Sequence, residues 1–119
     1  MTELKGMNVY TKDELTLVTF EDTGYLGGHS FMGQAAERLE GIVETHDSKL
    51  LVLDLKEITA LPSYLLGVLV SLKNRGVEIR LFNVTVDVRL ILETMNLDTH
   101  FDLRDGDLSA LIAESEKQS

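Results

Sequence analysis

Apolar and polar residues follow two different spacings along the chain, and the strand-like spacing comes first. The runs 7–10 and 15–20 are rich in β-forming residues and are separated by the polar stretch 11–14, which predicts an antiparallel hairpin. A continuous apolar run at 50–55 is typical of a strand that is covered on both faces. Further strands are expected at 78–83 and around 99–103.

Helical spacing begins after the glycine-rich stretch 24–29, where Ser30 is placed to cap a helix. The apolar positions that follow recur every three or four residues along one stripe, which consists of Met32, Ala35, Ala36, Leu39, Ile42 and Val43. This segment is therefore predicted to be an amphipathic helix with one buried face.

Start and stop residues mark the next two helices. One is expected from Ser63 to about residue 74, where a basic last turn is followed by Gly76. Thr85 is expected to cap another helix that reaches Met95, with Asn96 as its left-handed terminator.

A last helix is expected at about 108–116, and the ends 1–6 and 117–119 are expected to fray. The resulting order is β-β-α-β-α-β-α-β-α, which predicts an α/β fold with a mixed sheet of about five strands and about four helices. The 119 residues are expected to form a single domain, 1–119, with a core that needs no metal or disulfide.

Charge and composition narrow the function. Acidic residues outnumber Lys and Arg by 20 to 11, and the formal charge of -9 argues against nucleic acid and anionic membrane surfaces as partners. The absence of Cys removes disulfides and thiolate metal sites, and fits the cytoplasm. No apolar run approaches the ~18 residues of a membrane span, so neither export nor membrane insertion is expected.

The chain offers little that resembles a catalytic or metal site. His29, His46 and His100 lie on separate segments without a metal-binding spacing, and the glycines at 24–28 do not form a phosphate-binding motif. Asp54 is expected to hydrogen-bond the loop that follows it. We therefore predict no catalytic residues, no metal and no cofactor.

The corner at 58–69 is the strongest candidate for a functional site. It places a polar helix start, including Ser63, between a buried strand and an almost wholly apolar helix. Open α/β sheets usually carry their sites at the carboxyl ends of strands, where this corner lies.

Several segments together resemble a STAS domain, the module named for sulfate transporters and anti-sigma-factor antagonists. The resemblance rests on Leu51-Val52-Leu53-Asp54-Leu55, on Leu66-Gly67-Val68-Leu69, on Val88-Arg89 with Leu92-Glu93, and on Leu97-Asp98-Thr99-His100-Phe101. It implies a bacterial, non-enzymatic regulator of transcription that binds an anti-sigma factor or a kinase-like regulator. In that family, phosphorylation of a serine at the start of the second helix breaks the complex.

Tyr64 stands where the family has its phosphoacceptor serine, and Ser63 lies one residue upstream. Two interpretations of Ser63 are open. The favoured one is a structural cap, which contributes about 1 kcal/mol. The other is a displaced phosphorylation site, with Pro62 fixing the approach of the chain.

The second helix is apolar in nearly every direction, so it meets either its neighbouring helices or a partner. The predicted partner-binding residues are Pro62, Ser63, Tyr64, Leu65 and Val68. The third helix is also broadly apolar, and together the two helices form a docking face for a protein partner or for a second copy of the chain.

The sequence thus favours an anti-sigma-factor antagonist that acts by partner switching. The alternative is a STAS subunit of a transporter or signalling scaffold without a phosphorylation cycle. A receiver-like phosphoacceptor domain, suggested by Asp54 and Glu57 near one sheet edge, is weaker, because the early strand lacks the acidic pair of receivers.

Overall fold

The computed structural model describes the backbone of residues 6–21 and 29–118, with side chains for 6–21 and 33–117. The elements in chain order are β1 (Met7–Lys12), β2 (Leu15–Phe20), α2 (His29–Thr45), β3 (Leu50–Asp54), α3 (Ser63–Asn74), β4 (Glu78–Phe82), α4 (Val86–Thr94), β5 (Asp102–Arg104), α5 (Ser109–Glu114) and β6 (Glu116–Gln118). The strands form one six-stranded sheet in the order β5-β4-β3-β2-β1-β6. The predicted mixed α/β fold is confirmed.

The hairpin of β1 and β2 is antiparallel, as predicted, with Met7 opposite Phe20 and Lys12 opposite Leu15. Strand β1 continues into the polar stretch, so the turn consists of only two residues, and Asp13 takes a left-handed φ of 53°. From β2 onwards, β2, β3, β4 and β5 are parallel neighbours.

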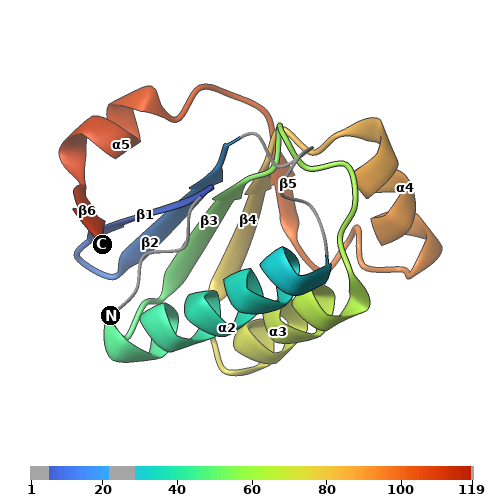
Figure 1. Cartoon of the computed structure of the whole chain (residues 1–119), viewed down its shortest axis with the longest axis horizontal. Helices are drawn as coiled ribbons and strands as arrows, with labels where there is room; N and C mark the ends of the chain where they lie inside the picture. The colour runs from blue at the N-terminus through green and yellow to red at the C-terminus, as the bar shows by residue number, and fades with distance from the viewer. Residues whose placement is uncertain (1–5, 22–28, 119) are drawn as a thin grey trace.

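The parallel strands follow one another in a single direction across the sheet, and this places the helices. Crossovers between parallel strands are almost always right-handed, so successive crossovers in one direction bring their helices to the same face. Figure 1 shows α2 and α3 side by side across one face, with α4 beside β5 and α5 on the other side of the sheet. The topology leaves that second face without a crossover helix.

The main core lies between the sheet and the crossover helices. Leu51, Leu53 and Leu81 of the central strands are fully buried there. Helix α3 contributes one buried stripe, formed by Leu65, Leu66, Leu69 and Leu72. Each fully buried leucine contributes about 1.5–3 kcal/mol relative to an exposed one, so this layer carries most of the hydrophobic stabilisation.

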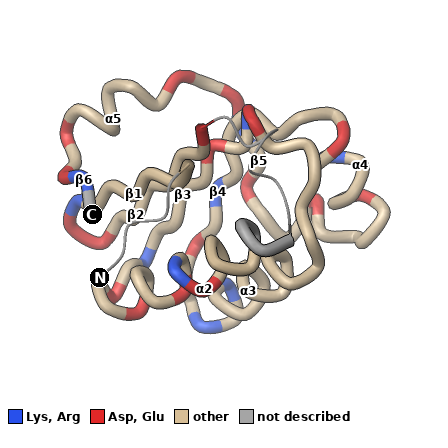
Figure 2. The backbone as a smooth tube through the Cα atoms, in the orientation of Figure 1, with Lys and Arg blue, Asp and Glu red and all other residues tan. Residues whose placement is uncertain are grey.

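A smaller apolar cluster lies on the opposite face, around Leu17, Val52 and Leu108. Partly buried residues of the strands and of α5 pack against it. No residue of α5 itself is fully buried. Figure 2 shows that charged positions are spread along the whole described chain, in strands as well as helices.

The predicted ends of α3 and α4 are confirmed. Gly76 has a φ of 97°, and the N–H groups of Gly76 and Val77 donate to the carbonyls of Lys73 and Leu72, at 3.0 and 3.1 Å. These two bonds form a Schellman motif. Asn96 ends α4 in the same way, with a φ of 58°.

The two predicted N-caps have different outcomes. Thr85 caps α4, because its hydroxyl oxygen accepts a hydrogen bond from the Val88 N–H at 3.3 Å. Helix α2 begins at His29, so Ser30 lies inside the first turn and is not the N-cap. The stretch 24–28 lies outside the described residues.

The C-terminal region departs furthest from the prediction. Strand β5 begins at Asp102 instead of residue 99, and α5 ends at Glu114. The expected fraying at 117–119 is wrong for Lys117 and Gln118, because they belong to β6, which pairs antiparallel with β1. The open edge of β1 supplies the backbone partners for this strand. At the other end, the Gly6 carbonyl accepts from the Glu21 N–H at 2.9 Å, and residues 1–5 lie outside the described residues.

Candidate functional site

The corner between β3 and α3 is held in place by its apolar residues. Leu55, Ile58 and Leu61 alternate with exposed positions and are buried. The Leu55 N–H donates to the Phe82 carbonyl at 2.9 Å, which extends the pairing of β3 with β4 by one step. The loop is therefore fixed from within and presents its polar residues outward.

Asp54 ties this loop to the sheet. Its carboxylate is buried and accepts hydrogen bonds from the Lys56 N–H at 3.2 Å and from the Asn83 side chain at 3.4 Å. The Lys56 ammonium lies 3.9 Å away. The predicted hydrogen bond from Asp54 to the following loop is thus confirmed.

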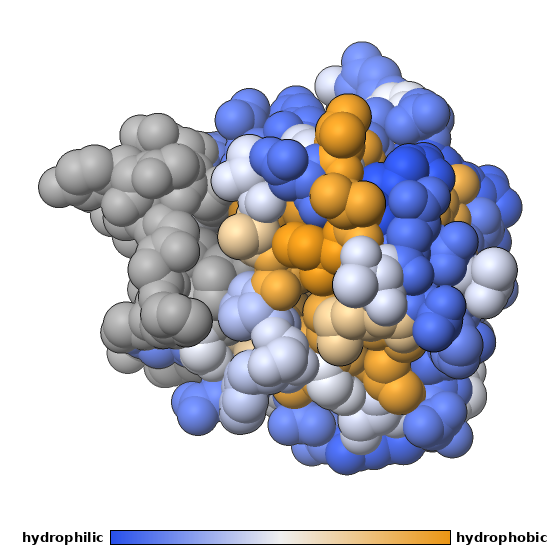
Figure 3. Space-filling model, turned by 90° about the vertical axis from the view of Figure 1, so that its right-hand side faces the viewer, coloured by the Kyte–Doolittle hydropathy of each residue, from blue (hydrophilic) through white to orange (hydrophobic). Residues whose placement is uncertain are grey.

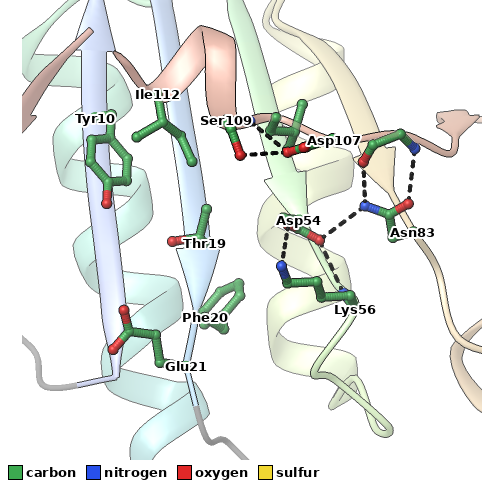
Figure 4. A pocket seen from close by; sticks show the side chains of 12 residues that line it. Tyr10, Thr19, Phe20, Glu21, Asp54, Lys56, Asn83, Asp107, Ser109 and Ile112 are labelled. Carbon is green, nitrogen blue, oxygen red and sulfur yellow. Dashed lines mark hydrogen bonds and ion pairs between the residues drawn. The ribbon is translucent and has the colours of Figure 1, made fainter.

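Asn83 is a structural residue that sequence reasoning missed. It has a left-handed φ of 58°, and its side chain donates to the Gly106 carbonyl at 2.8 Å and accepts from the Gly106 N–H at 3.0 Å. Together with its bond to Asp54, it links the ends of β3 and β4 to the segment before α5 (Figure 4). The only sequence signal was an Asn directly after a strand, where asparagine tolerates positive φ.

Ser63 does not cap α3, so the favoured interpretation of this residue is wrong. The N-cap position is Pro62, with φ -68° and ψ 152°, and no side chain caps the helix. The Pro62 carbonyl accepts the first helical bond, from the Leu66 N–H at 3.2 Å. Ser63 is the first helical residue, one position too late to cap. Its exposed side chain leaves the hydroxyl open to solvent.

The predicted partner-binding residues separate into two groups. Tyr64 is 55% exposed, Ser63 is exposed, and Pro62 and Val68 are half-buried. Leu65 is only 1% exposed and packs in the main core, so it is removed from the predicted docking surface. The helical period explains this, because Leu65 and Leu69 share the stripe that faces the sheet.

Helix α4 carries further exposed apolar residues. Val86 is 83% exposed and Leu90 62%, and Met95 at the C-cap is 46% exposed, while Val88 and Leu92 of the helix are buried in the core. Figure 3 shows an apolar stripe crossing this side of the molecule between polar surroundings. The predicted broad apolar face is therefore exposed on α4 more than on α3.

Helix α4 is joined to the β3–α3 corner by a direct contact. The Thr85 hydroxyl donates to the Ile58 carbonyl at 2.8 Å, while its oxygen also caps α4. The start of α4 and the loop that leads to Ser63 are thus held together.

No group of three or more potential ligands that could hold a metal ion occurs within residues 6–21 and 29–118. His46 and His100 are exposed, and the side chain of His29 lies outside the described set. Within the part of the chain that the structure covers, the helices are too short or too polar to traverse a bilayer.

The sequence itself matches no known family model and no curated protein. Solved structures do match. The anti-sigma factor antagonist SpoIIAA in its unphosphorylated form superposes with a TM-score of 0.69 at 12% identity, over 91% of this chain and 94% of that chain. The chain has the STAS fold.

Two further STAS structures have the same arrangement. A variant of RsbS from Moorella thermoacetica gives a TM-score of 0.64 at 20% identity, over 87% of this chain and 88% of its own. A chain of the stressosome, described as a signal integration and transduction hub, gives a TM-score of 0.57 at 23% identity, over 85% of this chain and 89% of that chain. At these identities the likeness concerns the STAS fold, and the functions belong to those proteins.

Proposed function

We propose that the chain is a regulatory protein-binding module that acts as an anti-sigma-factor antagonist by partner switching. The observation that carries the proposal is the uncapped, exposed start of α3 on a STAS fold, where Ser63 and Tyr64 are open to solvent above a rigid corner. The net charge of -9 favours a partner with a basic surface around an apolar centre.

The partner surface in this proposal consists of Pro62, Ser63, Tyr64 and Val68. A large, half-exposed aromatic such as Tyr64 is a typical binding hot spot, because it buries much area at a small entropic cost. The Asp54 network supports the surface from behind without contacting the partner.

Ser63 is the proposed phosphorylation site. Its hydroxyl is accessible, and its position at the first turn of α3 lets a phosphate meet the unpaired N–H groups of the helix start. The added phosphate carries about 1.5 to 2 negative charges, and placing this strongly hydrated group against the apolar centre of the partner surface would cost desolvation energy and break the complex. This mechanism needs a kinase that accepts a serine followed by tyrosine.

A second candidate is a STAS subunit in a permanent signalling scaffold, bound to other subunits or to a second copy of the chain. Two observations favour it: Tyr64 occupies the position at which the family carries its phosphoacceptor, and a stressosome chain is among the structural matches. In this case the same surface docks without a phosphate cycle.

The first experiment identifies the partner and then measures binding with purified components. The chain is isolated from its own organism with bound proteins, and the recovered partner is titrated by calorimetry. We expect an anti-sigma factor with a kinase domain. Recovery of scaffold subunits or a transporter in its place would contradict the antagonist proposal.

The Tyr64→Ala variant tests the surface. Loss of a hot-spot aromatic is expected to weaken partner binding by about 30-fold or more. The matched control is Leu111→Ala on the opposite face of the sheet, which is expected to bind as the wild type does. Equal affinities for Tyr64→Ala and the wild type would move the interface away from α3.

Substitutions of Ser63 separate the two candidates. In an antagonist, Ser63→Glu is expected to weaken partner binding at least about tenfold, while Ser63→Ala retains it. Ser109→Glu, which places the same charge at the first residue of α5, is the control. Mass spectrometry of the native protein shows whether Ser63 carries phosphate. An unmodified Ser63 together with normal binding by Ser63→Glu favours the scaffold.

A further inference from the structure

A hollow of about 700 Å³ lies between α5 and the second face of the sheet, at the carboxyl ends of β2, β3 and β4 (Figure 4). This volume falls within the roughly 300–1,000 Å³ typical of small-molecule sites. The strand order explains why the hollow exists, because the crossover helices all cover the other face and α5 covers this one only in part. The hollow is distinct from the proposed partner surface at the start of α3.

Part of its lining is apolar. Tyr10 and Ile112 both pack against the cluster of Leu17, Val52 and Leu108, and both also line the hollow. Each is only partly buried, so apolar surface of a ring and of a branched side chain faces the space. An apolar body of a ligand would be covered from the strand side and from the helix side.

The charges around the hollow are unbalanced. Among the described residues, three carboxylates, Glu21, Asp54 and Asp107, line it together with one ammonium group, that of Lys56. Lys56 forms an ion pair with Asp54 at 3.9 Å. Asp107 accepts hydrogen bonds from the N–H and the hydroxyl of Ser109, at 2.9 and 2.6 Å. Within the described residues, Glu21 has no cationic partner.

Two hydroxyl side chains, those of Tyr10 and Thr19, line the hollow on the same side as Glu21. Figure 4 shows Tyr10 on β1, Thr19 on β2 and Glu21 just after the end of β2, along one side of the hollow. Hydroxyl and carboxylate oxygens accept hydrogen bonds from an ammonium or guanidinium group, and the face of a tyrosine ring attracts cations. An anionic ligand would meet the net negative charge both of the hollow and of the whole chain.

We propose that this hollow binds a small organic cation with an apolar body. The ammonium or guanidinium group lies beside Glu21, Thr19 and Tyr10, and the apolar body lies between Tyr10 and Ile112. The ligand is held away from Lys56, which remains paired with Asp54.

The test uses dansylcadaverine, a fluorescent probe with an aromatic body and a terminal ammonium group. Its emission is expected to shift to the blue and to saturate as protein is added. The neutral dansyl butylamide and the anionic dansyl-aminohexanoate have the same aromatic body and are expected to bind at least about tenfold more weakly. Absence of saturable binding, or equal binding of the three probes, would overturn the proposal.

Matched variants then locate the cation. Glu21→Gln is expected to reduce the affinity for dansylcadaverine about fivefold, because it removes the charge and preserves the shape. Glu37→Gln removes the same charge from an exposed position of α2, on the other side of the sheet, and is expected to leave the affinity unchanged. Ile112→Ala is expected to weaken the binding of all three probes to a similar extent. Equal effects of Glu21→Gln and Glu37→Gln would show general electrostatics and would contradict a site at Glu21.

Discussion

The two faces of the sheet differ in how they are covered, although the same strands supply both. In β3, Leu53 belongs to the core that α2 and α3 cover, whereas Val52 belongs to the smaller cluster on the opposite face, with Leu108. In β4, Leu81 is fully buried, and Arg80 on the opposite face forms ion pairs with Glu78 and Asp102 at 2.6 and 3.6 Å. The face under α2 and α3 carries the main core that stabilises the fold, whereas the opposite face is less completely covered and is available for binding.

This difference shows that the strand order and the handedness of the crossovers determine which face of the sheet the helices cover, whatever the side chains are. Parallel strands added in one direction through right-handed crossovers receive their helices on one side only. Coverage of the second face then depends on the segment after the last parallel strand, which contains the short helix α5 and the three-residue strand β6. The proposed binding hollow on the second face therefore lies apart from the proposed partner surface at the start of α3.

The largest expected effect comes from comparing the same truncation on the two faces. Leu69→Ala in α3 removes a fully buried side chain and is expected to lower the free energy of unfolding by about 2–5 kcal/mol. Leu111→Ala in α5 removes a partly buried one and is expected to cost about 1 kcal/mol. Urea denaturation measures both. Equal losses would show that α5 covers its face as completely as α3 does.

The next largest loss of stability is expected from a buried polar pair on the helix-covered face. The hydroxyls of Thr16 and Ser48 form a buried hydrogen bond. Ser48→Ala leaves the Thr16 hydroxyl without this partner in a dry core, at an expected cost of about 1–3 kcal/mol. Adding Thr16→Val is expected to restore part of the loss. Chemical denaturation of the single and double variants tests this, and strictly additive losses would contradict the coupling.

Smaller losses of stability are expected at the starts of the two helices α4 and α3, and the two helix starts are expected to differ. Thr85→Ala removes the cap of α4 and the bond to the Ile58 carbonyl, and is expected to cost about 1–2 kcal/mol. Ser63→Ala is expected to change stability by less than about 0.5 kcal/mol, because Ser63 does not cap α3. Thermal and urea unfolding measure both variants. If Ser63→Ala lost as much stability as Thr85→Ala, Ser63 would have a structural role after all.

The smallest effect is expected from the exposed ion pairs of the open face. The pKa of Asp102 is lowered by the hydrogen bond from Arg104 and by the nearby charges of Arg104 and Arg80. Because the pKa is lower in the folded chain, the stabilisation is present above the ordinary pKa of an aspartate and is lost as the pH falls through the lowered value.

Asp102→Asn is therefore expected to reduce stability slightly at neutral pH and not at all in strong acid. Urea denaturation of the wild type and the variant at several pH values measures the difference. A difference that persists in strong acid, or that is insensitive to added salt at neutral pH, would contradict the electrostatic origin.

Most elements were predictable because their signals are local. The Gly76 and Asn96 terminators and the Thr85 cap act through hydrogen bonds within a few residues, so the sequence contains them completely. The apolar spacing of α2 likewise predicts its buried face, with Ala35 and Leu39 in the core. The mixed α/β architecture followed from the order of such elements, and the STAS resemblance was based on short segments such as Leu51–Leu55.

The failures depend on partners far away in the chain. Strand β6 has no apolar alternation, and its pairing exists because β1 presents a free edge. The tie from Asn83 to Gly106 requires two segments that only the fold brings together. A serine at the first helical position and a serine at the N-cap look alike in the sequence, so the role of Ser63 was misread.

The candidate site was only partly predictable. The corner at Ser63 and Tyr64 stood out because a helix start after a buried strand is a local signal. Leu65 was wrongly assigned to the partner surface. Nearly all residues of α3 are apolar, so the sequence does not show which side of the helix faces the sheet. The hollow beside Glu21 depends on where α5 settles, and no motif marks it.

The two edge strands have a consequence for solubility at high concentration. Strands β5 and β6 are each three residues long and carry charged side chains, Asp102 and Arg104 on one edge and Glu116 and Lys117 on the other. A strand from another molecule meets few free backbone groups there and must approach fixed charges, so addition to the sheet is unfavourable. At high concentration these two edges therefore disfavour the edge-to-edge growth that leads to fibrils.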